Sequence, residues 1–156
     1  MMVIKKTSNK YEDTYGCAYN FAKHLKKSDI IFLIGNLGAG KTLFAQGICK
    51  GLGIDNDVTS PTFNLLNIYE NPSRNLVVYH FDLYRLDRED ELENIGFNEY
   101  VYSDGISIIE WADKFLKYLP EEYLLVDIEK TGETEREIKI SFFGKRYEEL
   151  GKEIDF

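Results

Sequence analysis

The chain has 156 residues, of which 44% are hydrophobic and 29% are charged, a composition typical of a globular domain that buries a core. No apolar run approaches the length of a membrane span, and the N-terminus lacks the long apolar stretch of a signal peptide. The formal net charge of −8 argues against a surface that grips much nucleic acid directly, because such surfaces are usually basic. Cys17 and Cys49 belong to no C-x-x-C pair, which favours reduced thiols in a cytoplasmic protein. These features predict one domain over residues 1–156.

Helical and strand patterns alternate along the chain, with no internal repeat or linker. Strands are expected at 3–6, 30–34, 64–69, 76–81, 106–109, 124–129 and 137–143. Helices are expected at 11–27, 43–52, 88–94, 98–102, 112–118 and 147–151. Asn9 and Glu12 resemble a capping box at the start of the first helix. The polar turns at 70–75 and 131–135 predict two antiparallel hairpins in the sheet.

The most specific short motif lies between the strand at 30–34 and the helix at 43–52. It reads G-N-L-G-A-G-K-T over residues 35–42, the G-x-x-x-x-G-K-[ST] pattern of a phosphate-binding loop. Glycines let the backbone approach a phosphate, and the N–H groups at a helix N-terminus bind anions. We expect Lys41 to reach the β- and γ-phosphates of a nucleotide and the Thr42 hydroxyl to bind Mg²⁺. The expected nucleotide-binding residues are Gly35, Asn36, Leu37, Gly38, Ala39, Gly40, Lys41, Thr42 and Leu43.

This motif predicts an α/β fold of the P-loop NTPase type, one domain whose mixed sheet has a parallel core and antiparallel hairpins and is flanked by helices. Such a protein needs an acidic residue at the end of a buried strand to hold Mg²⁺. Two residues qualify, Asp82 after the strand at 76–81 and Glu110 after the strand at 106–109. Ligands bind at the carboxyl ends of parallel strands, so both acids are expected to face the phosphates.

Other residues near these motifs have two interpretations each. Thr59 and Thr62 lie on a loop where a γ-phosphate sensor is expected, but the same spacing suits a strand-entry turn ordered by Pro61. His80 lies inside an apolar run and is interpreted as a core histidine. Trp111 suits either the core or an exposed anchor for another protein.

Missing motifs narrow the class of P-loop protein. A small GTPase carries D-x-x-G and N-K-x-D after its loop, and neither follows this one. A small-metabolite kinase usually has an arginine-bearing lid, and no arginine-rich lid is apparent.

Four segments together resemble one family. They are the loop at 35–42, S-P-T-F at 60–63 with Thr59 before it, Y-H-F-D-L-Y-R-L at 79–86 and I-E-W-A at 109–112. In this order and spacing the chain closely resembles the TsaE (YjeE) family, the P-loop ATPases of bacterial tRNA threonylcarbamoyladenosine synthesis. The resemblance covers nearly the whole chain. Asn36 stands where many members have Asp, at a variable position of the loop.

The resemblance implies slow ATP hydrolysis within a complex with TsaD and TsaB, which modify adenosine 37 of tRNAs that read ANN codons. It implies that Lys41 contacts phosphates, that Thr42 and Glu110 hold Mg²⁺, and that Asp82 is needed near the γ-phosphate. It further implies a nucleotide-sensitive switch containing Thr59, Ser60 and Thr62, and it matches Trp111 to the family's E-W pair. The tRNA would be contacted through the complex.

Several alternatives stay open from the sequence. Asp82 would act on the attacking water directly or through Mg²⁺-bound water. The regions of Tyr11 and Arg136 are both candidates for the base pocket. A small-molecule kinase, or a nucleotide-gated binding module that hardly hydrolyses ATP, would carry the same loop. No arginine finger is apparent, which predicts slow turnover alone and faster turnover with partners.

Overall fold

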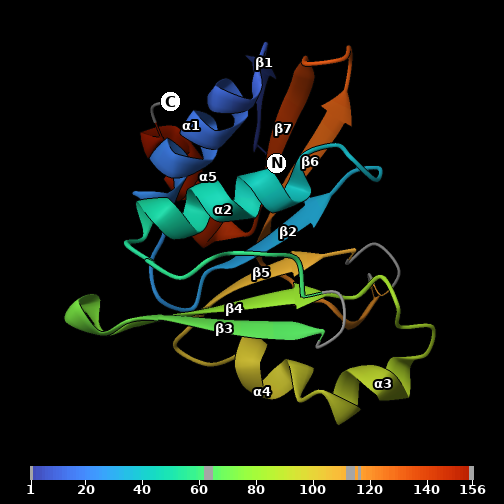
Figure 1. Ribbon diagram of the computed structural model, residues 1–156. Helices are drawn as coiled ribbons and strands as arrows, with labels where there is room; N and C mark the ends of the chain where they lie inside the picture. The colour runs from blue at the N-terminus through green and yellow to red at the C-terminus, as the bar shows by residue number, and fades with distance from the viewer. Residues whose placement is uncertain (1, 62–64, 112–114, 116, 155–156) are drawn as a thin grey trace.

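The computed structural model describes residues 2–61, 65–111, 115 and 117–154. These residues form a mixed seven-stranded sheet with helices against both faces (Figure 1). The strands are β1 Met2–Ser8, β2 Ile30–Ile34, β3 Leu66–Asn71, β4 Leu76–Asp82, β5 Ile106–Glu110, β6 Tyr123–Lys130 and β7 Arg136–Phe143. The helices are α1 Tyr11–Ala22, α2 Lys41–Gly51, the 3₁₀ turn η1 Pro72–Arg74, α3 Glu89–Asn94, α4 Phe97–Val101 and α5 Lys145–Glu153.

The sheet has a parallel centre and antiparallel edges, with the order β1-β7-β6-β2-β5-β4-β3. β2 pairs in parallel with β5 and β6, and β5 pairs in parallel with β4. The hairpins β3–β4 and β6–β7 and the pair β1–β7 are antiparallel. The predicted fold class and both predicted hairpins are therefore confirmed.

The central strand β2 is buried on both faces, which explains its continuous apolar sequence. Ile31 and Leu33 belong to the core beneath α1, α2 and α5. Ile30 and Phe32 point to the opposite face, into the core formed with α3 and α4. Figure 1 shows α1 and α2 side by side on one face and α3 and α4 together near β3 and β4.

α1 and α2 pack closely because α2 presents glycine to its neighbour. A Cβ atom on Gly47 would lie 2.7 Å from the carbonyl oxygen of Tyr15 and 2.7 Å from Cβ of Ala18. Gly51 similarly faces the carbonyl oxygen of Tyr19, at 2.6 Å from its ideal Cβ. These close contacts hold α2 against α1.

Two details of the first helix differ from the prediction. α1 ends at Ala22, and Leu25 reaches the core through turns in which Lys23, His24 and Leu25 donate to carbonyls three residues back. The capping box of Asn9 and Glu12 is not formed, because the helix begins after Lys10 and the Asn9 N–H donates to Asp13 Oδ2 at 3.1 Å. Of the short helix expected at 112–118, residues 112–114 and 116 lie outside the described residues.

Candidate functional site

The glycine-rich loop connects β2 to α2, as its sequence predicts. Gly40 stands immediately before α2. Its φ of 111° is a backbone conformation that residues with side chains rarely adopt. Gly35 has φ of 150°, and a Cβ atom there would lie 2.5 Å from the carbonyl oxygen of Ile128 on β6. The loop is therefore seated against the sheet at a point that admits only glycine, with the N-terminus of α2 beside it.

Lys41 is buried at the start of α2, with 6% of its surface exposed. Its Nζ donates to the carbonyl oxygen of Gly35 and lies 3.6 Å from the centroid of the Trp111 ring. Trp111 has φ of 62°, a left-handed conformation that turns the chain sharply directly after β5. The ring of Tyr84 lies against Trp111, with centroids 4.8 Å apart. Trp111 is thus half-buried beside the loop, and its role as an anchor for another protein stays a prediction.

The two predicted acids meet at one edge of the sheet. Asp82 and Glu110 are the last residues of the parallel neighbours β4 and β5, and they are register partners. Both are buried, at 6% and 2% exposure. Among the described residues, neither carboxylate has a lysine or arginine ion-pair partner, and Glu110 pairs with His80. This places two carboxylates beside the glycine-rich loop.

The surroundings of the two acids differ. Asp82 Oδ1 accepts from the backbone N–H of Tyr84 at 3.0 Å, and its Oδ2 accepts from the Ser60 hydroxyl at 2.8 Å. Glu110 Oε2 lies 2.6 Å from Nε2 of His80, which is fully buried. The interpretation of His80 as a core histidine missed this contact. The spacing shows only that His80, two residues before Asp82, shares its strand face; the contact with Glu110 depends on the register of β4 and β5.

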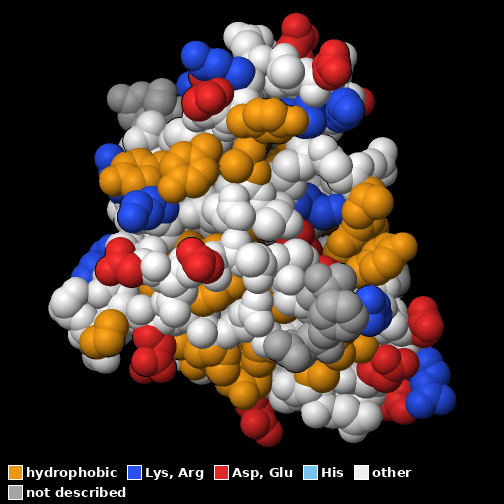
Figure 2. Space-filling view, viewed as in Figure 1, with side chains coloured by type: hydrophobic (Ala, Val, Ile, Leu, Met, Phe, Trp, Pro, Cys, Tyr) orange, Lys and Arg blue, Asp and Glu red, His pale blue; other side chains and the backbone are white. Residues whose placement is uncertain are grey.

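These residues line one cleft of about 420 Å³. It is bounded by the glycine-rich loop, the start of α2, Ser60, Asp82, Tyr84, Glu110 and Trp111. Leu37 and Tyr84 at its rim are strongly exposed, at 88% and 53%. Figure 2 shows hydrophobic side chains gathered along the right-hand edge, where the loop after β2 and the segment after β4 lie in Figure 1. The cleft thus has a polar floor and an apolar rim.

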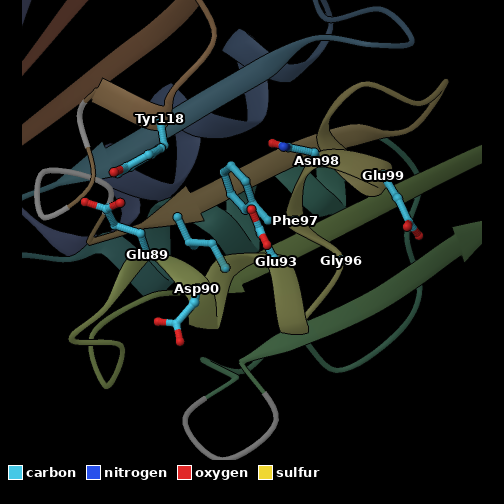
Figure 3. A pocket seen from close by; sticks show the side chains of 9 residues that line it. Glu89, Asp90, Glu93, Gly96, Phe97, Asn98, Glu99 and Tyr118 are labelled. Atoms are coloured by element: carbon cyan, nitrogen blue, oxygen red, sulfur yellow. The ribbon is translucent and has the colours of Figure 1, made fainter.

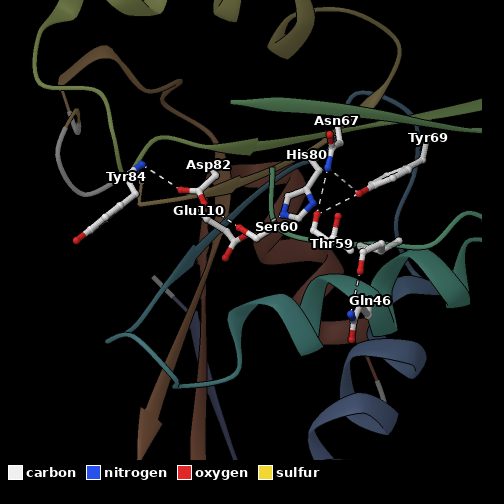
Figure 4. Close-up of polar contacts among 10 residues, drawn as sticks. Gln46, Thr59, Ser60, Asn67, Tyr69, His80, Asp82, Tyr84 and Glu110 are labelled. Atoms are coloured by element: carbon white, nitrogen blue, oxygen red, sulfur yellow. Dashed lines mark hydrogen bonds and ion pairs between the residues drawn. The ribbon is translucent and has the colours of Figure 1, made fainter. Parts of the chain in front are cut away.

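The predicted switch segment is held at this cleft by side chains from three elements (Figure 4). Gln46 on α2 donates to the Val58 carbonyl at 2.9 Å, and Ser60 donates to Asp82 on β4. Asn67 and Tyr69 on β3 both donate to the Thr59 carbonyl, at 3.2 and 3.3 Å. Ser60 faces the cleft and the Thr59 side chain is exposed, while Thr62 lies outside the described residues.

Arg136, one of the two candidates for the base pocket, is buried beneath the loop. Its Nε donates to the Ala39 carbonyl at 2.9 Å and its Nη2 to the Gly38 carbonyl at 3.3 Å. Its Nη1 donates to carbonyls of the β6–β7 turn, those of Gly132, Glu133 and Glu135. Arg136 therefore ties the glycine-rich loop to the hairpin, a role its sequence context did not indicate. Tyr11 is 61% exposed at the start of α1.

The cleft offers few protein ligands for a metal ion. Among the described residues, no group of three His, Cys, Asp or Glu side chains could hold a metal. This fits Mg²⁺ at a nucleotide, because Mg²⁺ binds through one or two protein oxygens together with phosphates and water. The Thr42 hydroxyl and the Glu110 carboxylate, both lining the cleft, are the donors expected for it.

A second cavity, of about 450 Å³, lies at the helices α3 and α4 (Figure 3). It is lined by Leu92, Phe97 and Tyr118 together with the acids Glu89, Asp90, Glu93 and Glu99. Four carboxylates would repel a triphosphate, and no glycine-rich loop borders this cavity. Of the two, the cleft at the glycine-rich loop is therefore the better candidate for an anionic ligand.

The sheet and this cleft define the class of the molecule, an α/β protein that carries the sequence motif of P-loop proteins between β2 and α2. No described helix is both long and apolar enough to cross a bilayer. The sequence pattern of the threonylcarbamoyl adenosine biosynthesis protein TsaE matches residues 8–138. The chain therefore belongs to the TsaE family.

Individual relatives agree with this assignment. The chain is 41% identical to the tRNA threonylcarbamoyladenosine biosynthesis protein TsaE of Bacillus subtilis over 143 residues, which cover 92% of this chain and 88% of that protein. It is 35% identical to the protein of the same name from Treponema pallidum, covering 88% of this chain and all of the relative. The crystal structure of YdiB from Bacillus subtilis superposes with a TM-score of 0.84 at 35% identity, over 98% of this chain and 94% of that one.

Proposed function

We propose that the protein is a slow, Mg²⁺-dependent ATPase that works with TsaB and TsaD to form N6-threonylcarbamoyladenosine at position 37 of tRNAs reading ANN codons. The observation that carries the ATPase part is the register pair Asp82–Glu110, which ends two parallel strands inside the cleft bordered by Lys41 and Thr42. The membership of the TsaE family carries the pathway. A cytoplasmic location remains a prediction from the sequence.

Each residue has a distinct role in this proposal. Lys41 would leave the Gly35 carbonyl and the Trp111 ring to bind the β- and γ-phosphates, together with the N–H groups at the start of α2. Thr42 and Glu110 would hold Mg²⁺, which when bound neutralises phosphate charge. Asp82, fixed by the Tyr84 N–H and the Ser60 hydroxyl, would orient the attacking water and accept its proton.

The proposed link to the partners runs through the cleft's rim and its switch segment. Ser60 contacts Asp82 directly, so a change at the γ-phosphate would alter the position of the segment before Pro61. The exposed Leu37 and Tyr84 offer apolar surface beside it, of the kind that contacts other proteins. No arginine finger is apparent, and such a group can contribute about 10³–10⁵-fold to hydrolysis. We therefore expect slow turnover alone and stimulation by the complex.

The test is ATP turnover by the purified protein, alone and with TsaD, TsaB and tRNA. The wild type is compared with Lys41→Ala and Glu110→Ala, and with Lys152→Ala on the exposed side of α5 as a matched control. We expect stimulation of the wild type and the control by the partners, and loss of turnover in both site variants. Turnover that ignores the partners but rises with a small acceptor would identify a kinase instead.

A second arm separates the ATPase from a nucleotide-gated binding module. If hydrolysis drives the function, Asp82→Asn should bind ADP normally and yet fail to support tRNA modification. Modification at the wild-type level by this variant would contradict the ATPase proposal and favour the binding module.

A further inference from the structure

The buried pair of His80 and Glu110 combines two residues from neighbouring strands. The side chain of His80 has no exposed surface, and its Nε2 lies 2.6 Å from Oε2 of Glu110, which is 2% exposed. The other ring nitrogen, Nδ1, is buried without a hydrogen-bond partner among the described residues. Among the described residues, the Glu110 carboxylate is therefore the single polar group that the ring contacts.

The unpartnered Nδ1 identifies the tautomer of the ring. With the proton on Nε2, the ring donates to the carboxylate and leaves only an acceptor unmet. With the proton on Nδ1, a buried N–H would lack an acceptor, and two acceptors would face each other at 2.6 Å. The Nε2–H form is therefore favoured. It occupies Oε2 of Glu110 and leaves Oε1 without a protein donor among the described residues.

A purely structural role accounts poorly for this histidine. The neighbours on the same sheet face, Val78 on β4 and Ile108 on β5, are apolar and fully buried. An aliphatic residue at position 80 would continue this surface without burying a polar atom that lacks a hydrogen-bond partner. What an aliphatic residue lacks is the donor to Glu110.

We propose that His80 is a positioning residue that orients the Glu110 carboxylate so that Oε1 faces a divalent cation at the phosphate-binding loop. The inference rests on the proposed function, which assigns Glu110 to the metal. Donors behind a metal-binding carboxylate fix its orientation, and their removal typically weakens metal affinity about 10–100-fold. His80 does not border the cleft itself, so its effect must pass through Glu110.

The test compares His80→Gln with His80→Asn, two amides that differ in reach. The amide nitrogen of glutamine extends about as far as Nε2 of histidine, whereas that of asparagine extends only to the position of Nδ1. Binding of Mn²⁺ in the presence of ADP is measured by electron paramagnetic resonance, and ADP binding is measured separately with EDTA. Ser107→Ala is the control, because Ser107 is also buried without a partner in the described chain but lies on the other sheet face.

We expect Mn²⁺ affinity about 10-fold or more below wild type for His80→Asn, and within about 3-fold of wild type for His80→Gln and Ser107→Ala. ADP binding with EDTA should stay within about 2-fold in all of them, because His80 touches no phosphate-binding residue. Equal Mn²⁺ affinity for the two amide variants would overturn the inference. Should one variant unfold, the pair would be compared at the same folded fraction, determined by circular dichroism.

Glu110→Gln distinguishes failure of this inference from failure of the proposed function. If Glu110→Gln weakens Mn²⁺ binding while both His80 variants match wild type, the metal site stands and the role of His80 is wrong. If Glu110→Gln binds Mn²⁺ and ADP like wild type, the assignment of the metal to Glu110 is itself wrong, and the inference falls with it.

Discussion

The hydroxyl of Ser60 donates a 2.8 Å hydrogen bond to Oδ2 of Asp82, although 22 positions separate them in the chain. This bond joins the segment that leads to Pro61 with the carboxyl end of β4 (Figure 4). The opposite oxygen of Asp82 is held by the Tyr84 N–H. Asp82 is thus oriented from both sides, by one rigid donor from the backbone and one donor from a loop side chain.

Asp82→Asn and Ser60→Ala should therefore differ in strength. Asp82→Asn removes the proposed proton acceptor and should slow single-turnover ATP hydrolysis by about 10²–10⁴-fold. Ser60→Ala removes one of the two hydrogen bonds that orient the Asp82 carboxylate. Because the Tyr84 N–H still holds the other oxygen, hydrolysis should slow by only about 10-fold or less. Equal losses in the two variants would mean that Ser60 itself acts in the chemical step.

Trp111 is the sole tryptophan and should report nucleotide binding by its fluorescence. Lys41 Nζ lies 3.6 Å from its ring centroid, and binding phosphates would draw the ammonium group away. This cation–π contact contributes only about 0.5–2 kcal/mol, so phosphate binding can displace it. ADP should change the emission of the wild type, measured with excitation of the tryptophan alone. Lys41→Met lacks the ammonium group, so its emission should differ before any ADP is added and should respond little. A full response in Lys41→Met would contradict this origin.

Arg136→Lys should loosen the glycine-rich loop. The guanidinium donates to carbonyls of Gly38, Ala39 and the β6–β7 turn, and a lysine cannot reach both sides at once. We expect a loss of about 2–4 kcal/mol in the free energy of unfolding and roughly 10-fold weaker ADP binding. Urea denaturation and calorimetric titration measure the two effects. Arg88→Lys is the control, because Arg88 is 73% exposed in a surface ion pair and should change stability by less than about 0.5 kcal/mol.

Two helical glycines should respond in opposite directions to alanine. In α1, a Cβ on Gly16 would meet no atom within 4 Å, so Gly16→Ala should stabilise by about 0.5–1 kcal/mol through helix propensity. In α2, a Cβ on Gly47 would lie 2.7 Å from the Tyr15 carbonyl, so Gly47→Ala should destabilise by about 1–3 kcal/mol. Thermal unfolding measures both. A stabilised Gly47→Ala variant would show that α1 and α2 are packed less tightly than described.

The two thiols should be inert in the folded protein. Burial raises the pKa of Cys17 to about 11 and that of Cys49 to about 12, from an ordinary value of 9.0. At pH 8 the thiolate fraction of Cys17 is then about 100-fold below that of an exposed thiol, so alkylation by iodoacetamide should await unfolding. Since the unfolded thiols ionise at lower pH than the folded ones, their contribution to stability falls as pH rises above 9. Rapid modification of Cys49 under native conditions, detected by mass spectrometry, would contradict its burial.

The sequence predicted the fold well where local patterns and tertiary structure agree. β2, the loop at 35–42 and α2 follow from an apolar run, a glycine motif and helical spacing, and all three were correctly located. The strand ends also sufficed to bring Asp82 and Glu110 together, because carboxyl ends of parallel strands share one edge. The first helix was predicted too long because Leu25 continues its apolar spacing, and no residue with helix-breaking chemistry follows Ala22.

The contacts that complete the site depend on register and on side-chain reach. His80 meets Glu110 because β4 and β5 pair with Asp82 opposite Glu110, and the sequence does not fix that register. Arg136 meets Gly38 and Ala39 nearly a hundred residues away, through the order of strands in the sheet. The roles assigned to Thr42, Thr59 and Thr62 in binding and switching stay predictions.

The acids of the site and its switch segment are supported in unequal ways. Asp82 and Glu110 belong to paired strands of the sheet. Residues 58–60 are instead held by side-chain hydrogen bonds, which involve Gln46, Ser60, Asn67 and Tyr69. Side-chain hydrogen bonds contribute about 0.5–1.5 kcal/mol each, so these ties can exchange without opening the sheet. Amide hydrogen exchange should therefore be fast for residues 58–60 and as slow as global unfolding for β4 and β5. Residues 58–60 could then change position while Asp82 and Glu110 stay fixed at the ends of their paired strands.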